Sequence, residues 1–236
     1  MENFDNSGEF SQEQIIQETD SFFRKVYGWM FLGLIVSAAT AYYISINPEY
    51  YKVILFHKWV FFSIILTHFL LVAGLVGFIE KISAGLAIFL FFLYCFFTGL
   101  TFSIIFLVFT VESIEKIFFI SAMMFGAMSV YGYFTKADLS HIGQVLIMGL
   151  IGLVIASVVN FFIGSEKADY ILSWVGVIIF TGLTAYDTQK IRNANIIGNE
   201  GTSEDTKESI IGALTLYLDF VNLFLELLRL LGKRRK

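Results

Sequence analysis

Two aspartates stand out because they fall within long apolar stretches of the chain. Asp187 ends one apolar run, and Asp219 lies midway along the next, about 15 Å by helical rise from either end. An aspartate at the centre of a membrane helix costs about 2.5–3.5 kcal/mol on insertion scales. Such a residue usually faces a polar partner or a water-filled cavity, so both aspartates are candidate functional residues.

If the two carboxyl groups meet, their chemistry is constrained. Two acids in a low-dielectric site cannot both ionise cheaply, so they titrate as a coupled pair. A shared proton would hold their helices together, and its loss would leave two repelling charges that separate or recruit a cation. Calcium suits such a site, because hard cations prefer carboxylate and carbonyl oxygens. The pair therefore predicts a combined proton sensor and ion gate, with Asp187 and Asp219 as weak calcium ligands.

Three further polar residues follow Asp219 on the same face of the helix. Asn222, Glu226 and Arg229 stand at i+3, i+7 and i+10 from it, in a helix otherwise made of apolar residues. A lipid-facing stripe would place three ionisable groups in hydrocarbon, so we expect it to face protein or water. The stripe is a candidate pore lining.

Each aspartate also has a purely structural interpretation. Asp187 would be a helix-end residue paired with Lys190, three positions along the chain. Asp219 would make a structural hydrogen bond to a neighbouring helix. Spacing alone leaves both alternatives open.

The elements that must position these residues are membrane helices. Of the 236 residues, 57% are hydrophobic and only 15% are charged, and the mean hydropathy is +0.74, which is typical of a chain dissolved in a bilayer. Crossing a hydrocarbon core of about 30 Å takes about 20 apolar helical residues. Seven runs of that kind alternate with short charged connectors: Val26–Ile46, Trp59–Ile79, Ile82–Thr110, Ile117–Thr135, Leu139–Ile163, Tyr170–Asp187 and Ser209–Leu231. The sequence therefore predicts an all-α membrane protein with a bundle of seven transmembrane helices.

The chain divides into three parts by composition. Residues 1–21 are acidic and polar and predict a mobile or surface-lying tail, residues 22–232 form the membrane domain, and residues 233–236 form a short basic tail. Lysine and arginine are divided almost evenly between the two sides of the membrane. The orientation therefore stays open, with a slight preference for a cytoplasmic C-terminus.

Several classes of function are disfavoured. We find no HExxH zinc motif and no GxSxG elbow, and His57, His68 and His141 lie on separate segments without ligand spacing. The single cysteine, Cys95, excludes an intramolecular disulfide and a cysteine-based metal cluster. No basic stripe for nucleic acid occurs outside the C-terminal tail. We expect neither an enzyme nor a resident cofactor.

The residues around both aspartates resemble a known family. Thr184–Arg192, TAYDTQKIR, and Gly212–Gly232, GALTLYLDFVNLFLELLRLLG, resemble the signature of the Bax inhibitor-one family, the transmembrane Bax inhibitor motif proteins. Lys25–Leu34 and Phe125–Ser140 resemble its bacterial inner-membrane branch. The likeness spans nearly the whole chain after the acidic tail.

The resemblance implies a bundle whose C-terminal helix lies in the centre, wrapped by the other six. It also implies a pH-sensitive calcium leak controlled by a di-aspartyl unit, whose positions here are Asp187 and Asp219. Two departures are evident. Glu80 and Lys81 stand where channel-type members carry an arginine latch, and Glu226 replaces an expected apolar or aromatic residue.

Two functions follow as hypotheses for a multi-pass protein of the bacterial inner membrane. The first is a proton-gated leak of calcium through the bundle, with the bilayer, calcium and protons as partners. The alternative is a non-conducting regulator of a membrane-bound AAA protease or of stress and cell-death pathways. In the alternative, residues 1–21 would be the handle that the protease engages.

Overall fold

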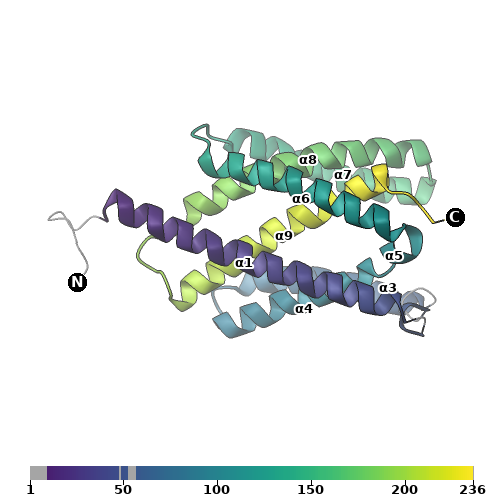
Figure 1. The fold of residues 1–236 in the computed structure, drawn as a ribbon, viewed down its shortest axis with the longest axis horizontal. Coiled ribbons are helices and arrows are strands. Elements are labelled where there is room, and N and C mark those ends of the chain that lie inside the picture. The colour runs from purple at the N-terminus through teal and green to yellow at the C-terminus, as the bar shows by residue number, and fades with distance from the viewer. Residues whose placement is uncertain (1–9, 48, 53–56, 236) are drawn as a thin grey trace.

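The computed structural model describes residues 10–47, 49–52 and 57–235, and their regular structure is helical apart from one isolated bridge between Phe109 and Arg234. The long helices run roughly along one direction, and the first and last residues that the structure describes lie at opposite ends of the bundle (Figure 1). The helices are α1 Gln12–Ser45, α3 Lys58–Phe78, α4 Ala84–Phe102, α5 Ile105–Val108, α6 Val111–Phe134, α7 Ser140–Ile163, α8 Glu166–Ala194 and α9 Ser203–Leu231.

The helices have the lengths that a bilayer demands. Within the described residues, six are long and apolar enough to cross a membrane, and α3 contributes a shorter apolar stretch, Phe62–Phe78. The third predicted run, Ile82–Thr110, is interrupted, because α4 ends at Phe102 and the short α5 follows. The chain is a multi-pass helical membrane protein, as its composition predicts.

The C-terminal helix is the most enclosed of these six. In α9, 72% of the apolar window is buried, against 6% in α7. Helix α9 packs mainly against α1, α4, α6 and α8, while α3 packs against α4 and α7 against α8. Figure 1 shows α9 passing between the α1–α4 layer and the α6–α8 layer. The two aspartate-bearing helices, α8 and α9, are therefore packed side by side within the bundle.

The first helix begins earlier than the sequence predicts. Ser11 caps α1 through a capping box with Gln14, so helix starts at Gln12, within the segment predicted to be a mobile or surface-lying tail. Residues 12–21 are half-buried or exposed, so this part of the predicted tail lies on the surface as a helix. The sequence did not reveal the helix, because these residues include few apolar ones. The first nine residues lie outside the described part.

The basic C-terminal tail is fixed to the rest of the bundle. After α9 the chain turns back, and the backbone of Lys233 and Arg234 runs antiparallel to that of Phe109 and Thr110, between α5 and α6. Thr110 N–H donates to the Lys233 carbonyl at 3.0 Å, and Lys233 N–H donates to Ser113 Oγ at 2.9 Å. The end of α9 is therefore tied to the start of α6.

Candidate functional site

The structure brings the two aspartates together. Asp187 on α8 and Asp219 on α9 place their carboxyl groups as direct neighbours. Asp219 is 5% exposed, whereas Asp187 is half-buried. Oδ2 of Asp219 is buried and has no hydrogen-bond partner among the described residues. One oxygen of the pair is thus available for a proton, a water molecule or a cation.

Asp187 sits inside its helix and not at its end. The sixth predicted run stops at Asp187, but α8 continues for seven residues to Ala194. The neighbouring hydroxyls of Thr184 and Thr188 each donate 2.7 Å hydrogen bonds to carbonyls one turn earlier in α8. These hydroxyls are therefore satisfied by their own helix, and the carboxyl group of Asp187 has that of Asp219 as a neighbour.

The structural interpretation of Asp187 as the partner of Lys190 is not supported by the geometry. The two side chains form no ion pair within 4.0 Å, and the Lys190 ammonium instead lies 6.0 Å from the centre of the Tyr186 ring. Lys190 acts on Asp187 through its charge at longer range. The aspartate is thus left to interact with Asp219.

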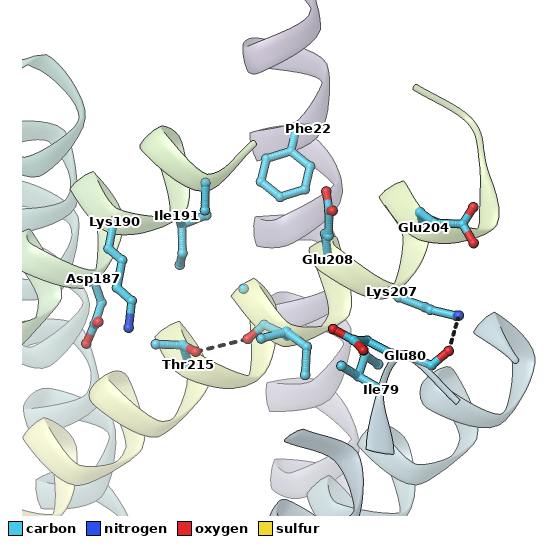
Figure 2. Close-up of a pocket in the computed structure, with 13 residues that line it drawn as sticks. Phe22, Ile79, Glu80, Asp187, Lys190, Ile191, Glu204, Lys207, Glu208 and Thr215 are labelled. Atoms are coloured by element: carbon cyan, nitrogen blue, oxygen red, sulfur yellow. Dashed lines mark hydrogen bonds between the residues drawn. The ribbon is translucent and has the colours of Figure 1, made fainter. Parts of the chain in front are cut away.

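A cavity of about 500 Å³ reaches Asp187 from the end of the bundle where α8 ends and α9 begins. Figure 2 shows its wall, which α1, α8, α9 and the turn that follows α3 provide. Its charged lining residues, besides Asp187, are Glu80, Lys190, Glu204, Lys207 and Glu208. The sequence did not predict this cavity, because its lining comes from four helix ends that are distant along the chain.

The polar stripe after Asp219 does not form a single open channel wall. Asn222 donates its side-chain amide to the Leu218 carbonyl at 2.8 Å within α9. Further along, Nη1 of Arg229 lies 3.2 Å from Oε1 of Glu226. The Glu226 side chain is 12% exposed and that of Arg229 48%. The stripe therefore ends in an ion pair at the far end of the contact between α8 and α9. We call this whole contact the α8–α9 seam.

The ligands available to a calcium ion at the aspartate pair are few. The described part of the chain contains no group of three or more His, Cys, Asp or Glu side chains that could hold a metal ion. A cation at the pair would therefore have two carboxylates, completed by carbonyl oxygens or water, which fits a weakly held hard ion. Among the histidines, His68 packs against Tyr94 and contacts Thr98, away from the aspartates.

Comparison with known proteins places the chain in a family. The family profile described as "Inhibitor of apoptosis-promoting Bax1" matches residues 19–236. The chain belongs to the Bax inhibitor-one family. It is 46% identical over 236 residues to the inner membrane protein YbhL of Escherichia coli (strain K12), a match that covers 100% of both chains. It is also 44% identical over 224 residues to an uncharacterized protein of Borreliella burgdorferi, covering 95% of this chain and 97% of the relative.

The match confirms the resemblance that the motifs indicate. Both motifs of this Bax inhibitor-one family member lie within the matched residues, and they carry the two aspartates that α8 and α9 bring together. The family assignment does not by itself give either carboxyl group a role.

Sequence reasoning missed a clamp beside the cavity. Lys25 on α1 pairs with Asp205 at 2.6 Å, and the Asp205 carboxylate also accepts from Gly201 N–H at 2.8 Å. The Glu18 carboxylate accepts from the backbone N–H groups of Gly198 and Glu200 in the α8–α9 loop. The contacts that Lys25 and Glu18 make join positions about 180 residues apart, and local patterns carry no signal for them. They fix the start of α1 to the loop that connects the two aspartate helices.

A second missed feature is a buried hydrogen-bond network in α9. The Tyr217 hydroxyl lies 2.6 Å from Ser37 Oγ on α1, and Ser37 in turn donates to the Cys95 carbonyl on α4 at 2.7 Å. Tyr217 is fully buried. Since a lone tyrosine in an apolar run predicts either core or interface, sequence could not separate this network from ordinary packing.

Proposed function

We propose that this protein is a pH-sensitive leak pathway for calcium, gated by Asp187 and Asp219 between α8 and α9. The observation that carries the proposal is the position of the pair. Two neighbouring acids, one of them with an unpartnered buried oxygen, lie where a cavity from one end of the bundle reaches α8. Ordinary helix packing gives no reason to place two like charges together in an apolar bundle.

The gate works through the proton that the pair shares. With one proton between them, the carboxyl groups attract each other and α8 and α9 stay in contact. When that proton leaves, two negative charges face each other in a medium of low dielectric constant, and the helices separate or a cation enters. The sign follows directly: acid conditions close the pathway, and rising pH opens it.

The charged residues that line the cavity attract cations toward the gate. Glu80, Glu204 and Glu208 add negative charge along its wall, which raises the local concentration of divalent cations. Lys190 and Lys207 line the same wall and act as tethered cations that a calcium ion must pass. Calcium would then meet Asp187 first and the buried oxygen of Asp219 second.

The proposal includes the membrane arrangement. The six long helices and α3 together make seven spans, with α9 as the inner helix. The E. coli relative is named an inner membrane protein, and we assign this chain to the same kind of membrane. Neither termini nor connectors need to enter the bilayer for the cavity to receive ions from one side.

The experiment is calcium influx into vesicles that contain the purified protein, measured across pH. Wild type should pass more calcium as pH rises, by at most about tenfold per pH unit for a gate that loses one proton. Asp219→Asn and Asp187→Asn should each flatten this dependence, because neither retains a pair that shares a proton. Asp138→Asn, an exposed acid in the connector before α7, is the matched control and should keep the parent profile. If both pair variants keep the flux and pH profile of the parent, the gate assignment is wrong.

The alternative, a non-conducting regulator of a membrane-bound AAA protease, has less support. It needs residues 1–21 as a free handle, yet residues 12–21 belong to α1 and Glu18 binds the α8–α9 loop. Deleting residues 1–9 tests what is left of the idea. The leak proposal expects no change in calcium flux, whereas the regulator hypothesis requires a changed half-life in cells.

A further inference from the structure

A second acidic position lies along the α8–α9 seam. Glu226 follows Asp219 by seven residues, about 10.5 Å along α9, and Gly176 precedes Asp187 by eleven residues, about 16.5 Å along α8. Both separations are close to whole numbers of helical turns, so each helix presents both positions on one face. The seam therefore has two levels: the aspartate pair at one, and Gly176 with Glu226 at the other.

Gly176 makes room for the Glu226 side chain. A Cβ atom at Gly176 would lie 2.7 Å from Cγ and 3.0 Å from Cδ of Glu226. The carboxyl group therefore rests directly against the backbone of α8, in space that any larger residue would fill. Glu226 is inserted between the two helices and is not directed toward lipid.

Two further oxygen-bearing side chains of α8 act on this carboxyl group, Ser173 as a direct neighbour and Asp169 through its charge. The Ser173 hydroxyl lies beside Glu226 and has no hydrogen-bond partner among the described residues. Ser173 is 1% exposed. Asp169, one turn earlier on α8, is exposed and acts on Glu226 through its charge. A buried hydroxyl without a hydrogen-bond partner, beside a carboxyl group that is only 12% exposed, leaves an unfilled position for a water molecule or an ion.

In the structure, Arg229 supplies the positive charge that pairs with the Glu226 carboxylate. Its Nη1 lies 3.2 and 3.4 Å from the two carboxylate oxygens of Glu226, and its side chain is 48% exposed. An ion pair with one partner this exposed is weak, so the guanidinium can leave Glu226 for water at low cost. The oxygen donors would then be free for another cation.

We propose that Glu226, Ser173 and Asp169 form a second cation-binding station, held at rest by the Arg229 guanidinium and occupied by a divalent cation during passage. This inference rests on the proposed leak function and deepens it. Two carboxylates and a hydroxyl, completed by water, make a weak site for a hard divalent ion. Weak binding at successive sites is what conduction requires, since an ion must also leave each one.

Between the two stations the seam is mostly apolar, with the Asn222 amide as a polar group on the α9 side. Phe180 and Leu183 occupy the turns of α8 between Gly176 and Asp187, and Leu223 follows Asp219 on α9; all three are buried. An ion that passes the aspartate pair therefore loses its ligands before it reaches water. Glu226 is the next carboxylate on the seam, and its role is to receive that ion.

The test compares calcium and potassium flux in vesicles that contain the full-length protein. Arg229→Gln should raise calcium flux by up to about fivefold, the range of an exposed ion pair, without moving the pH midpoint. Glu226→Gln should lower the calcium-to-potassium flux ratio, and Glu226→Asp should restore part of it. Glu112→Gln and Lys116→Gln are matched controls, because they form a pair at the same end of the bundle that is 77% and 68% exposed. Both controls should behave as the parent.

A binding measurement separates this proposal from the gate. Mn²⁺ is the probe, followed by its electron paramagnetic resonance in detergent at high pH. Glu226→Gln should remove one class of bound Mn²⁺ and Asp219→Asn another. Loss of pH gating in the aspartate variants, with flux ratio and Mn²⁺ binding unchanged in Glu226→Gln, would overturn the station and leave the gate intact. Unchanged gating in the aspartate variants would overturn the gate, while the Mn²⁺ signal lost in Glu226→Gln would still support the station.

Discussion

Helices α7 and α9 both have the length of a membrane span, yet they are placed in opposite ways. The apolar window of α7 has a mean hydropathy of 2.6 and is 6% buried, whereas that of α9 has 1.7 and is 72% buried. In a soluble protein the more apolar helix would be inside. Here lipid is as apolar as the core, so burying an apolar helix gains little, while polar groups must be enclosed. The need to enclose polar residues, and not the mean hydropathy of the whole helix, therefore decides which helix lies inside the bundle.

The contrast extends to the helix ends and gives the largest expected effect. Asp205 in the first turn of α9 is 2% exposed and pairs with Lys25 at 2.6 Å. Asp205→Ala should lower the free energy of unfolding by about 3 kcal/mol, because it removes a buried carboxylate that accepts charge-assisted hydrogen bonds from Lys25 and from the Gly201 N–H group. Reversible unfolding in mixed detergent micelles measures this. Glu112→Ala breaks an exposed pair with Lys116 and should cost no more than about 1 kcal/mol. Equal effects would show that enclosure of α9 does not matter at this end.

The span pattern was predictable because each helix must satisfy the same length and hydropathy rule. Asp187 and Asp219 could be singled out as candidates for a related reason: an acid in an apolar run is costly wherever it lies, so each needs a polar partner, and the structure makes them neighbours. The length of α8 was not, since its last turns, beyond Asp187, are polar and resemble a connector. Contacts with a distant segment hold these turns, since the Gln189 side chain accepts from Leu139 N–H and donates to the Ala137 carbonyl.

Contacts between distant segments were beyond the reach of sequence reasoning. Glu18 in the supposed tail binds the backbone of Gly198 and Glu200, and nothing in its local pattern indicates a partner. Glu226 could be predicted as unusual but not as a neighbour of Gly176, because the crossing of α8 and α9 sets that contact. Periodicity gives the face of a helix, and packing decides what the face meets.

Shortening one large apolar side chain in each helix should affect stability differently in α9 and α7. Leu216 in α9 is 0% exposed and Ile151 in α7 is 57% exposed. Leu216→Ala should destabilise the protein by about 2 kcal/mol, near the lower end for buried leucines, because packing contacts are lost although lipid would solvate the freed surface. Ile151→Ala should have almost no effect, since lipid replaces the missing atoms. The midpoints of detergent unfolding for both variants and the parent provide the measurement. A comparable loss in Ile151→Ala would mean that α7 is covered in the membrane, by another copy of the chain or by a partner.

The smallest expected effect has the opposite sign and concerns the second buried acid of α9. Asp219→Val should raise the free energy of unfolding by about 1 kcal/mol, because a buried polar pair is often less stable than an apolar replacement. Removing Asp219 takes no partner from a positive charge, whereas removing Asp205 takes one from Lys25, because the neighbour of Asp219 is another acid, Asp187. The same unfolding assay at neutral pH gives the value, with Asp219→Asn as the variant of matched size. A gain in stability with a loss of pH gating identifies a residue kept for function at a cost in stability. A fall in stability of the size seen for Asp205→Ala would instead support the structural interpretation, in which Asp219 holds α9 to its neighbour.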